Sequence, residues 1–319
     1  MDSIINDYPH SPLLGELHAA FERRDASDAC TSQQATFRAA DGRPLQGRLF
    51  RPPHPAKAAL LLGGATGVPQ RFYARYAEWL AAQGFTVLTF DYRGVGASRD
   101  RPLAQDDARM RDWGLLDLPA ALDHLHQHSP GLPLYFLGHS VGGQMLGLMP
   151  NRHLISKAVL VASGFGYWRN MPRRYGYMVK ALIAGLGPLL YRSLGYSPHS
   201  KIGWGEDLPR GVAEDWFRWC QRPDYFAELL HEQGKTHFDD LTLPLLSFSF
   251  VDDPIATEAN VSAQLGLYRA AAVTKAIIHP TDHGLRAIGH LHFFSARMPQ
   301  ALWQRPLDWL QSPATGPVS

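Results

Sequence analysis

The stretch Gly138-His139-Ser140-Val141-Gly142-Gly143 decides the fold of this 319-residue chain. It directly follows the apolar run 134–137 and directly precedes the apolar stretch 144–149. A serine between two glycines, with a strand before it and a helix after it, is typical of a tight turn that holds the serine at the end of a sheet. Because the turn is tight, the residues two before and two after the serine must be very small. We expect a strained backbone at Ser140, beside a helix N-terminus that favours negative charge.

Strand-like and helix-like segments alternate through most of the chain. The strand candidates are residues 35–40, 45–50, 58–62, 85–90, 134–137, 158–161, 245–251 and 276–278, and the helix candidates are 71–83, 113–126, 257–269 and 299–310. This alternation predicts an α/β fold with a mainly parallel, eight-stranded sheet and helices on both faces. The first two candidates flank Asp41-Gly42, so we expect an antiparallel hairpin at one edge. The run 58–62 is apolar throughout, as a strand covered on both faces should be.

The interval 164–243 breaks this alternation and is rich in aromatic residues. Thirteen aromatic residues lie between Phe165 and Phe226. Such a composition favours a helical lid over an apolar pocket, with Trp168 and Trp204 as substrate-binding candidates. The alternative is that the aromatics form a small core of the insertion itself, and both arrangements can hold together. The apolar run 181–190 is compatible with contact with lipid or with a buried lid helix, and its length and its glycine and proline content favour the buried helix.

These patterns divide the chain into three parts. Residues 1–31 are polar and weakly patterned, so we expect an N-terminal arm there. Residues 32–163 and 244–319 form the predicted core, and residues 164–243 form the predicted lid.

Composition excludes several classes of function. The chain is 45% hydrophobic and 19% charged, as globular proteins are, and its formal net charge of +2 gives no reason to expect a nucleic-acid partner. The first residues lack a basic segment followed by an apolar one, so no signal peptide is expected. No uninterrupted apolar stretch of about 18 residues exists, so we expect no spanning helix and no stable membrane association. Cys30 and Cys220 match no metal or redox spacing, which favours a reduced, cytoplasmic location. No metal or organic cofactor is expected.

Five blocks of the sequence together resemble the α/β-hydrolase superfamily between about residues 37 and 310. The blocks, in chain order, are Leu62-Gly63-Gly64-Ala65-Thr66-Gly67, Asp91-Tyr92-Arg93-Gly94-Val95-Gly96-Ala97-Ser98, Gly138 to Gly143, Val251-Asp252-Asp253-Pro254-Ile255, and Gly289-His290-Leu291-His292-Phe293-Phe294. They occupy the places where that superfamily carries its oxyanion loop, its D-x-R-G-x-G-x-S loop, its nucleophile, its acid and its histidine. Within the superfamily the chain is most similar to predicted esterases grouped with serine aminopeptidase-like and monoglyceride lipase-like hydrolases.

The resemblance implies a catalytic triad with Ser140 as the nucleophile. Asp252 and Asp253 both stand at the acid position, and in an extended backbone only one of two adjacent side chains can face the histidine. The family's acid usually precedes a short turn of the D-x-I/V type, which favours Asp253 and leaves Asp252 as the alternative.

Four histidines lie near the last strand, namely His279, His283, His290 and His292. The family's histidine commonly follows a glycine and precedes aromatic residues. Gly289 and the pair Phe293-Phe294 therefore favour His290, with His283 as the second choice.

Two backbone N–H groups are expected to form the oxyanion hole. Val141 follows the nucleophile and should supply one of them. Ala65, with Thr66 as the second choice, should supply the other from the loop after the third strand. The chain lacks the histidine that the family often has in that loop, which leaves the side-chain support of the loop undefined. His139 is expected to form a wall of the nucleophile turn and to contact substrate.

A serine hydroxyl needs an adjacent base, and a carboxylate holds the histidine in the required tautomer. The resemblance therefore implies a serine hydrolase that cleaves a carboxylic ester through an acyl-enzyme, on a small and apolar acyl substrate. An acyltransferase with an alcohol or amine acceptor, a thioesterase and an amidase remain as alternatives. A non-catalytic receptor on the same fold is disfavoured, because all three types of triad residue are present. The sequence does not define the oligomeric state.

Overall fold

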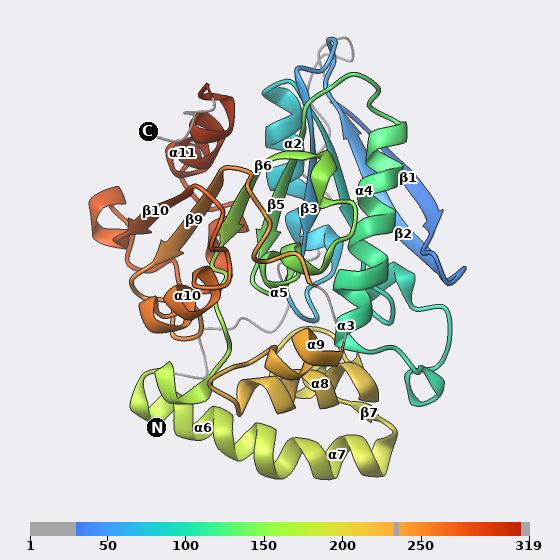
Figure 1. Cartoon of the computed structure of the whole chain (residues 1–319), viewed down its shortest axis with the longest axis vertical. Coiled ribbons are helices and arrows are strands. Elements are labelled where there is room, and N and C mark those ends of the chain that lie inside the picture. Colours follow the sequence, from blue (N-terminus) through green and yellow to red (C-terminus); the bar gives the residue numbers. More distant parts are fainter. Residues whose placement is uncertain (1–29, 233–235, 314–319) are drawn as a thin grey trace.

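The computed structural model of the protein describes residues 30–232 and 236–313, and its centre is an eight-stranded sheet (Figure 1). The strands are β1 (Thr31–Arg38), β2 (Pro44–Arg51), β3 (Ala58–Gly63), β4 (Phe85–Phe90), β5 (Leu134–His139), β6 (Ile155–Val161), β9 (Leu245–Phe250) and β10 (Val273–Ile278). Their order in the sheet is β1-β2-β4-β3-β5-β6-β9-β10. The pairs β1–β2 and β2–β4 are antiparallel and the other five pairs are parallel. The predicted sheet and its antiparallel edge hairpin are confirmed.

Helices cover both faces of this sheet. The helices are α2 (Ala74–Ala82), α3 (Met110–Asp112), α4 (Leu118–Gln127), α5 (Val141–Gln144), α6 (Arg173–Ala181), α7 (Gly187–Leu194), α8 (Arg210–Cys220), α9 (Ala227–Glu232), α10 (Glu258–Leu265) and α11 (Gln300–Gln311). Two short strands, β7 (Tyr196–Ser197) and β8 (Leu208–Pro209), form a separate antiparallel pair.

Alternate side chains of the central strands belong to two hydrophobic cores, one on each face of the sheet. In β3 every residue is buried: Leu60 and Leu62 belong to the cluster that includes residues of α2 and α11, while Ala59 and Leu61 belong to the cluster that includes residues of α4 and α10. Successive side chains of a strand point to opposite faces, so a strand covered on both faces must be apolar throughout. The uninterrupted apolar run 58–62 has this cause.

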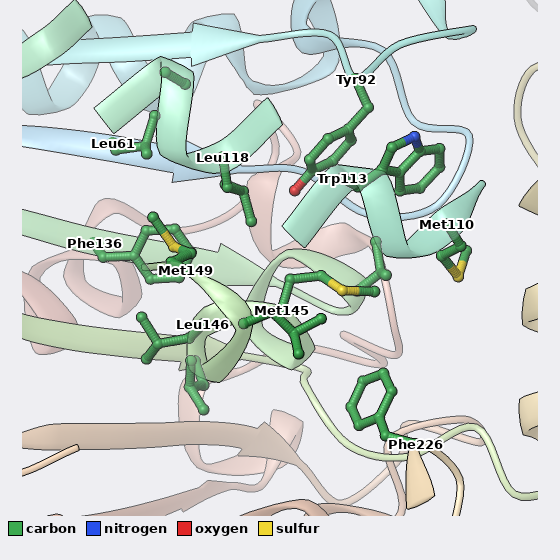
Figure 2. Close-up of a cluster of buried hydrophobic side chains, with 14 of the residues drawn as sticks. Leu61, Tyr92, Met110, Trp113, Leu118, Phe136, Met145, Leu146, Met149 and Phe226 are labelled. Atoms are coloured by element: carbon green, nitrogen blue, oxygen red, sulfur yellow. The ribbon is translucent and has the colours of Figure 1, made fainter. Parts of the chain in front are cut away.

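The segment after Ser140 is shorter as a helix than the sequence suggested. Helix α5 has four residues, and a 3-10 turn, Leu146–Leu148, follows it. Gly142, Gly143 and Gly147 are poor helix formers, which accounts for the early end. The apolar residues that follow α5 are nevertheless buried, and Figure 2 shows Met145, Leu146 and Met149 among Leu61, Leu118 and Phe136 from the strands and helices above them.

The segment 164–243 lies at the end of the sheet where α5 lies, and Figure 1 shows α6, α7, α8 and α9 gathered there. Its aromatic residues do not form a separate core. Phe165, Phe217 and Phe226 belong to the same hydrophobic cluster as Leu61 and the other sheet residues on that face. The described residues of the segment therefore share one hydrophobic core with this face of the sheet.

The apolar run 181–190 corrects one expectation. A π-helical turn, Leu182–Leu186, joins α6 to α7, and Ile183 is buried against the rest of the segment. Leu186 and Leu189, however, are 53% and 64% exposed. The run is apolar on both its inner and its outer side, so the expected buried helix is buried on one side only.

No helix of residues 30–232 and 236–313 is long and apolar enough to cross a bilayer.

The predicted N-terminal arm, residues 1–31, lies outside the described residues except for its last two. Of these, Thr31 is the first residue of β1, because the edge strand begins four residues earlier than the pattern at 35–40 indicated.

Candidate active site

The turn at Ser140 has the strained geometry that its glycines predict. Ser140 has φ of 53° and ψ of −118°, a region that residues other than glycine seldom adopt. A Cβ atom on Gly138 would lie 2.4 Å from the Cα of Gly143, and one on Gly142 would lie 2.2 Å from the carbonyl oxygen of Gly63. Larger side chains at either position would collide with backbone. The expectation that both positions must be very small is confirmed.

Three side chains that are far apart in sequence meet beyond the carboxyl ends of the parallel strands. Ser140 follows β5, Asp253 follows β9, and His290 lies in the loop between β10 and α11. The Nε2 atom of His290 is 2.9 Å from the Oγ of Ser140, and its Nδ1 atom is 2.8 Å from the Oδ2 of Asp253. An imidazole held between a hydroxyl and a carboxylate can accept the hydroxyl proton while the carboxylate stabilises the resulting charge.

Asp253 is built to remain ionised although it is only 3% exposed. Its Oδ1 accepts hydrogen bonds from the backbone N–H groups of Ile255 and Ala256 at 2.8 and 2.9 Å, and its Oδ2 faces His290. Burial by itself raises the pKa of a carboxyl group, but the charge and hydrogen bond of His290, with the two N–H groups, outweigh it. The pKa of Asp253 therefore lies below its ordinary value.

Asp252 binds a different part of the same loop. Its Oδ2 accepts hydrogen bonds from the backbone N–H groups of Ile288 and Gly289 at 2.8 and 2.9 Å. The two adjacent aspartates thus divide their contacts: Asp253 binds the ring of His290, and Asp252 binds the backbone just before it. The sequence offered the two as alternatives for one position and gave no sign of this second contact.

The other histidine candidates lie elsewhere. His283 Nε2 is 3.3 Å from the guanidinium of Arg305, and His292 Nδ1 is 3.1 Å from the carbonyl oxygen of Ile288. No hydrogen bond or ring contact in the described parts of the chain joins His279, His283 or His292 to Ser140.

His139 does not line a substrate site as expected. It is 0% exposed, and both ring nitrogens have partners. Nδ1 is 2.8 Å from the hydroxyl of Tyr73, and Nε2 is 2.8 Å from the carbonyl oxygen of His290. Burial, reinforced by the neighbouring His290, lowers the pKa of His139 to about 3, so its ring is neutral at ordinary pH.

The candidate oxyanion donors differ in availability. Val141 is the first residue of α5, and the N–H of a first helical residue has no acceptor within its helix. The N–H of Ala65 instead donates a hydrogen bond of 2.8 Å to the hydroxyl of Tyr73. The expectation of a free N–H at Ala65 is therefore wrong for this state of the molecule, because a tyrosine of the adjacent 3-10 helix, Gln70–Tyr73, occupies it.

The two tryptophan candidates lie in the 164–243 segment. Trp168 is 9% exposed and carries the cationic groups of Arg169 and Lys180 over its ring. Trp204 is half-buried, with its ring 6.5 Å from that of Trp216. Within residues 30–232 and 236–313, no ring contact or hydrogen bond joins either indole to Ser140 or His290.

The sequence gave no indication of the contacts that Glu206 makes. Its backbone N–H donates to the carbonyl oxygen of Gly67 at 2.8 Å, and its side chain accepts from the N–H of Gly96 at 2.8 Å and from Arg71 at 2.7 Å. This residue ties the 164–243 segment to two of the loops at the end of the sheet.

Among the described residues, no group of three histidine, cysteine, aspartate or glutamate side chains is placed to hold a metal ion.

The fold and this side-chain arrangement are those of the α/β-hydrolase class. Residues 54–284 match the family model described as Hydrolase_4, serine aminopeptidase S33, and the chain belongs to that family. The resemblance inferred from the five sequence blocks is confirmed.

Individual relatives are more distant. The chain is 27% identical to esterase FrsA of Escherichia fergusonii over 200 residues, which cover 59% of this chain but only 41% of that protein. It is 29% identical to human monoglyceride lipase over 104 residues, one third of each chain. The Pyrococcus furiosus esterase Pf2001 has a similar structure, with a TM-score of 0.56 and 16% identity over 88% of this chain and 91% of that one. At that identity the structural likeness concerns the fold.

Proposed function

We propose that the protein is a serine hydrolase that cleaves a small carboxylic ester through an acyl-enzyme, with Ser140, His290 and Asp253 as its triad. The observation that carries this proposal is the position of His290, whose two ring nitrogens lie within 2.9 Å of Ser140 Oγ and Asp253 Oδ2. A neutral imidazole in this position is a general base toward the hydroxyl and a general acid toward the leaving group.

In the first half of the reaction, Ser140 Oγ attacks the ester carbonyl carbon while its proton passes to Nε2 of His290. The imidazolium is stabilised by Asp253, which is ionised because its pKa lies below the ordinary value. When the tetrahedral intermediate collapses, the C–O bond to the alcohol breaks and His290 returns the proton to the alcohol oxygen. In the second half, water takes the place of the alcohol and the acid is released.

The negative charge on the carbonyl oxygen requires two N–H donors. Val141 supplies one in this proposal. Thr66 supplies the other, because the N–H of Ala65 is engaged with Tyr73.

We further propose that residues 164–243 form a lid that selects the acyl group. The support is the contact of Glu206 with the loops at Gly67 and Gly96, which lie at the end of the sheet where Ser140 stands. Trp168 and Trp204 belong to this lid, and their effect on substrate is through the shape of an apolar pocket. Esterase and lipase relatives support an ester as substrate.

The test combines a probe with a panel of substrates. A fluorophosphonate should label the protein at Ser140, and Ser140→Ala should remove labelling and lower kcat by roughly 10⁶. p-Nitrophenyl esters of increasing acyl length should be hydrolysed, whereas aminoacyl p-nitroanilides, which test an aminopeptidase, should be poor substrates. Turnover by Ser140→Ala within tenfold of the wild type, with correct folding in both, would remove Ser140 from the mechanism.

A further inference from the structure

A continuous chain of buried hydrogen bonds crosses the site behind the reacting groups. The N–H of Ala65 lies 2.8 Å from the hydroxyl of Tyr73, that hydroxyl 2.8 Å from His139 Nδ1, and His139 Nε2 2.8 Å from the carbonyl oxygen of His290. Tyr73 is 1% and His139 0% exposed. The chain therefore joins the loop after β3, the turn at Ser140 and the loop that carries His290.

Elementary hydrogen bonding allows only one direction along this chain. The carbonyl oxygen of His290 can only accept, so the proton of His139 must be on Nε2. In the neutral ring Nδ1 is then bare and accepts, so the Tyr73 hydroxyl donates to it. The oxygen of Tyr73 is left to accept from the N–H of Ala65. Every donor has an acceptor, and no other tautomer of His139 satisfies all three bonds.

We propose that Tyr73 and His139 are positioning residues, which lock the oxyanion loop and the His290 loop to the nucleophile turn. This inference rests on the proposed function, because it assigns a purpose to groups that surround Ser140 and His290. We call the chain from the Ala65 N–H to the His290 carbonyl the Tyr73–His139 relay.

The relay acts because His139 is the residue directly before Ser140. Its ring moves with the nucleophile turn, and through Nε2 it fixes the backbone of His290 at the carbonyl. Asp252 fixes the N–H groups of Ile288 and Gly289 in the same loop. His290 is thus held through its backbone as well as through the contact of its ring with Asp253. Both contacts limit how far the ring can move from Ser140, and catalysis by positioned groups is sensitive to such displacements.

The relay also explains a departure from the family pattern. This chain has Gly63 where the family often has a histidine, and that glycine cannot support the oxyanion loop with a side chain. Tyr73 provides a side-chain bond to this loop from outside it, at Ala65. Burial raises the pKa of Tyr73, so its hydroxyl stays protonated near neutral pH. The low pKa of His139 keeps its ring neutral, so Nδ1 can still accept a hydrogen bond. Titration near neutral pH therefore does not break the relay.

Two variants cut the same link of the relay. Tyr73→Phe removes the hydroxyl, and His139→Gln keeps a donor near the position of Nε2 but offers no acceptor near that of Nδ1. Each should lower kcat toward a p-nitrophenyl ester roughly tenfold, with KM changed less than twofold, because positioning acts in the transition state. The double variant should lose no more than about the larger single loss, whereas independent effects would multiply to roughly 100-fold.

Tyr92→Phe is the matched control. The Tyr92 hydroxyl is buried and has no hydrogen-bond partner within the described residues, so its removal should leave kcat unchanged. Binding of a boronic acid, which forms a tetrahedral adduct with a serine oxygen, should weaken in Tyr73→Phe in parallel with kcat. A lower melting temperature with unchanged kcat and unchanged boronic acid affinity would show that the hydroxyl is merely structural, and would overturn the proposal.

The tautomer of His139 provides a readout that does not depend on activity. In the wild type, ¹⁵N NMR of the ring should find the proton on Nε2 and a bare Nδ1. A proton on Nδ1 would break the direction of the relay and refute it. If the wild type has the expected tautomer but is not labelled at Ser140 and cleaves no ester, the proposed function fails while the hydrogen-bond chain stands.

Discussion

At the scale of single residues, Asp252 and Asp253 are neighbours with identical side chains but different hydrogen-bond partners. Asp253 is buried and faces the ring of His290, while Asp252 is exposed and accepts two backbone N–H groups. Both residues lie beyond the end of β9, where the chain turns and the N–H of Asp253 bonds to the carbonyl oxygen of Phe250 at 3.1 Å, so the two side chains have different partners.

Conversion of each aspartate to asparagine is therefore a matched pair. Asp253→Asn should lower kcat by roughly 10⁴, because an amide can donate to His290 and stabilise the wrong tautomer. Asp252→Asn should lower it less than tenfold, because the amide oxygen can still accept from the N–H groups of Ile288 and Gly289. Steady-state kinetics of the two variants compares their losses in kcat. A larger loss in Asp252→Asn than in Asp253→Asn would transfer the acid role to Asp252.

Glycine at position 142 is a second residue-scale feature with a measurable cost. Gly142→Ala should lower the free energy of unfolding by about 1–3 kcal/mol or more, because the new Cβ would lie 2.2 Å from the carbonyl oxygen of Gly63. Gly185→Ala is the control, since a Cβ there meets no atom within 4 Å, and it should raise stability by up to about 1 kcal/mol. Urea denaturation of both variants is the measurement. Equal stability of the two would mean that the nucleophile turn can open away from β3.

At the scale of elements, the sequence predicted what local patterns encode. The strands that become β3, β4 and β9 are buried throughout because both of their faces are covered. In β3 the uninterrupted apolar run 58–62 makes this visible without any knowledge of its neighbours. The short turn Asp253-Pro254-Ile255 likewise pointed to the aspartate that contacts His290.

Other features could not be read from local patterns. The bond from Ala65 to Tyr73 depends on how a following helical turn packs over the loop, and the bond from Asp252 to the His290 loop joins residues 36 and 37 positions apart. The run 181–190 was misjudged for a related reason. An apolar composition predicts burial, but a helix has an outer side, and here Leu186 and Leu189 lie on it.

The segment 164–243 carries a prediction about selectivity. If it forms a lid over the acyl group, Trp168→Ala and Trp204→Ala should shift the acyl length at which kcat/KM is highest, since each buried methylene contributes about 0.8 kcal/mol. Labelling at Ser140 by a fluorophosphonate should persist. Leu189→Ala is the control on the same segment, because that side chain is 64% exposed and should not affect the preferred length. Loss of labelling without a change in length preference would contradict the division between core and lid.

At the scale of the whole molecule, buried ionisable groups couple stability to pH. His139 has a folded pKa of about 3, below the ordinary value of 6.5, so the unfolded chain binds the extra proton between these values. Its contribution is complete above about pH 6.5 and is lost as pH falls toward 3. The low pKa of Asp253 acts in the same sense at more acidic pH. Asp117 opposes them, because burial raises its pKa to about 6 and favours the folded state on acidification.

A difference measurement separates His139 from these other groups. The free energy of unfolding of the wild type minus that of His139→Gln should shrink as pH falls below about 6.5, by up to about 1.4 kcal/mol per pH unit. Asp117 and Asp253 are present in both proteins, so most of their contribution cancels. Chemical denaturation at several pH values between 4.5 and 7.5 provides the data. A difference that is flat across this range would show that His139 is not held neutral in the folded protein.

The order of the site residues along the chain is also an order in time during synthesis. Ser140 and His290 are separated by 150 positions, and a ribosome adds about 5–20 residues per second. For roughly 8–30 seconds the nascent chain therefore possesses Ser140 and its glycine turn but not His290. During the same interval His139 lacks the carbonyl oxygen of His290 as a hydrogen-bond partner. If Ser140 and His290 act together as proposed, a polypeptide interrupted before residue 290 carries the serine without its base, because the loop that holds His290 is made only after β10.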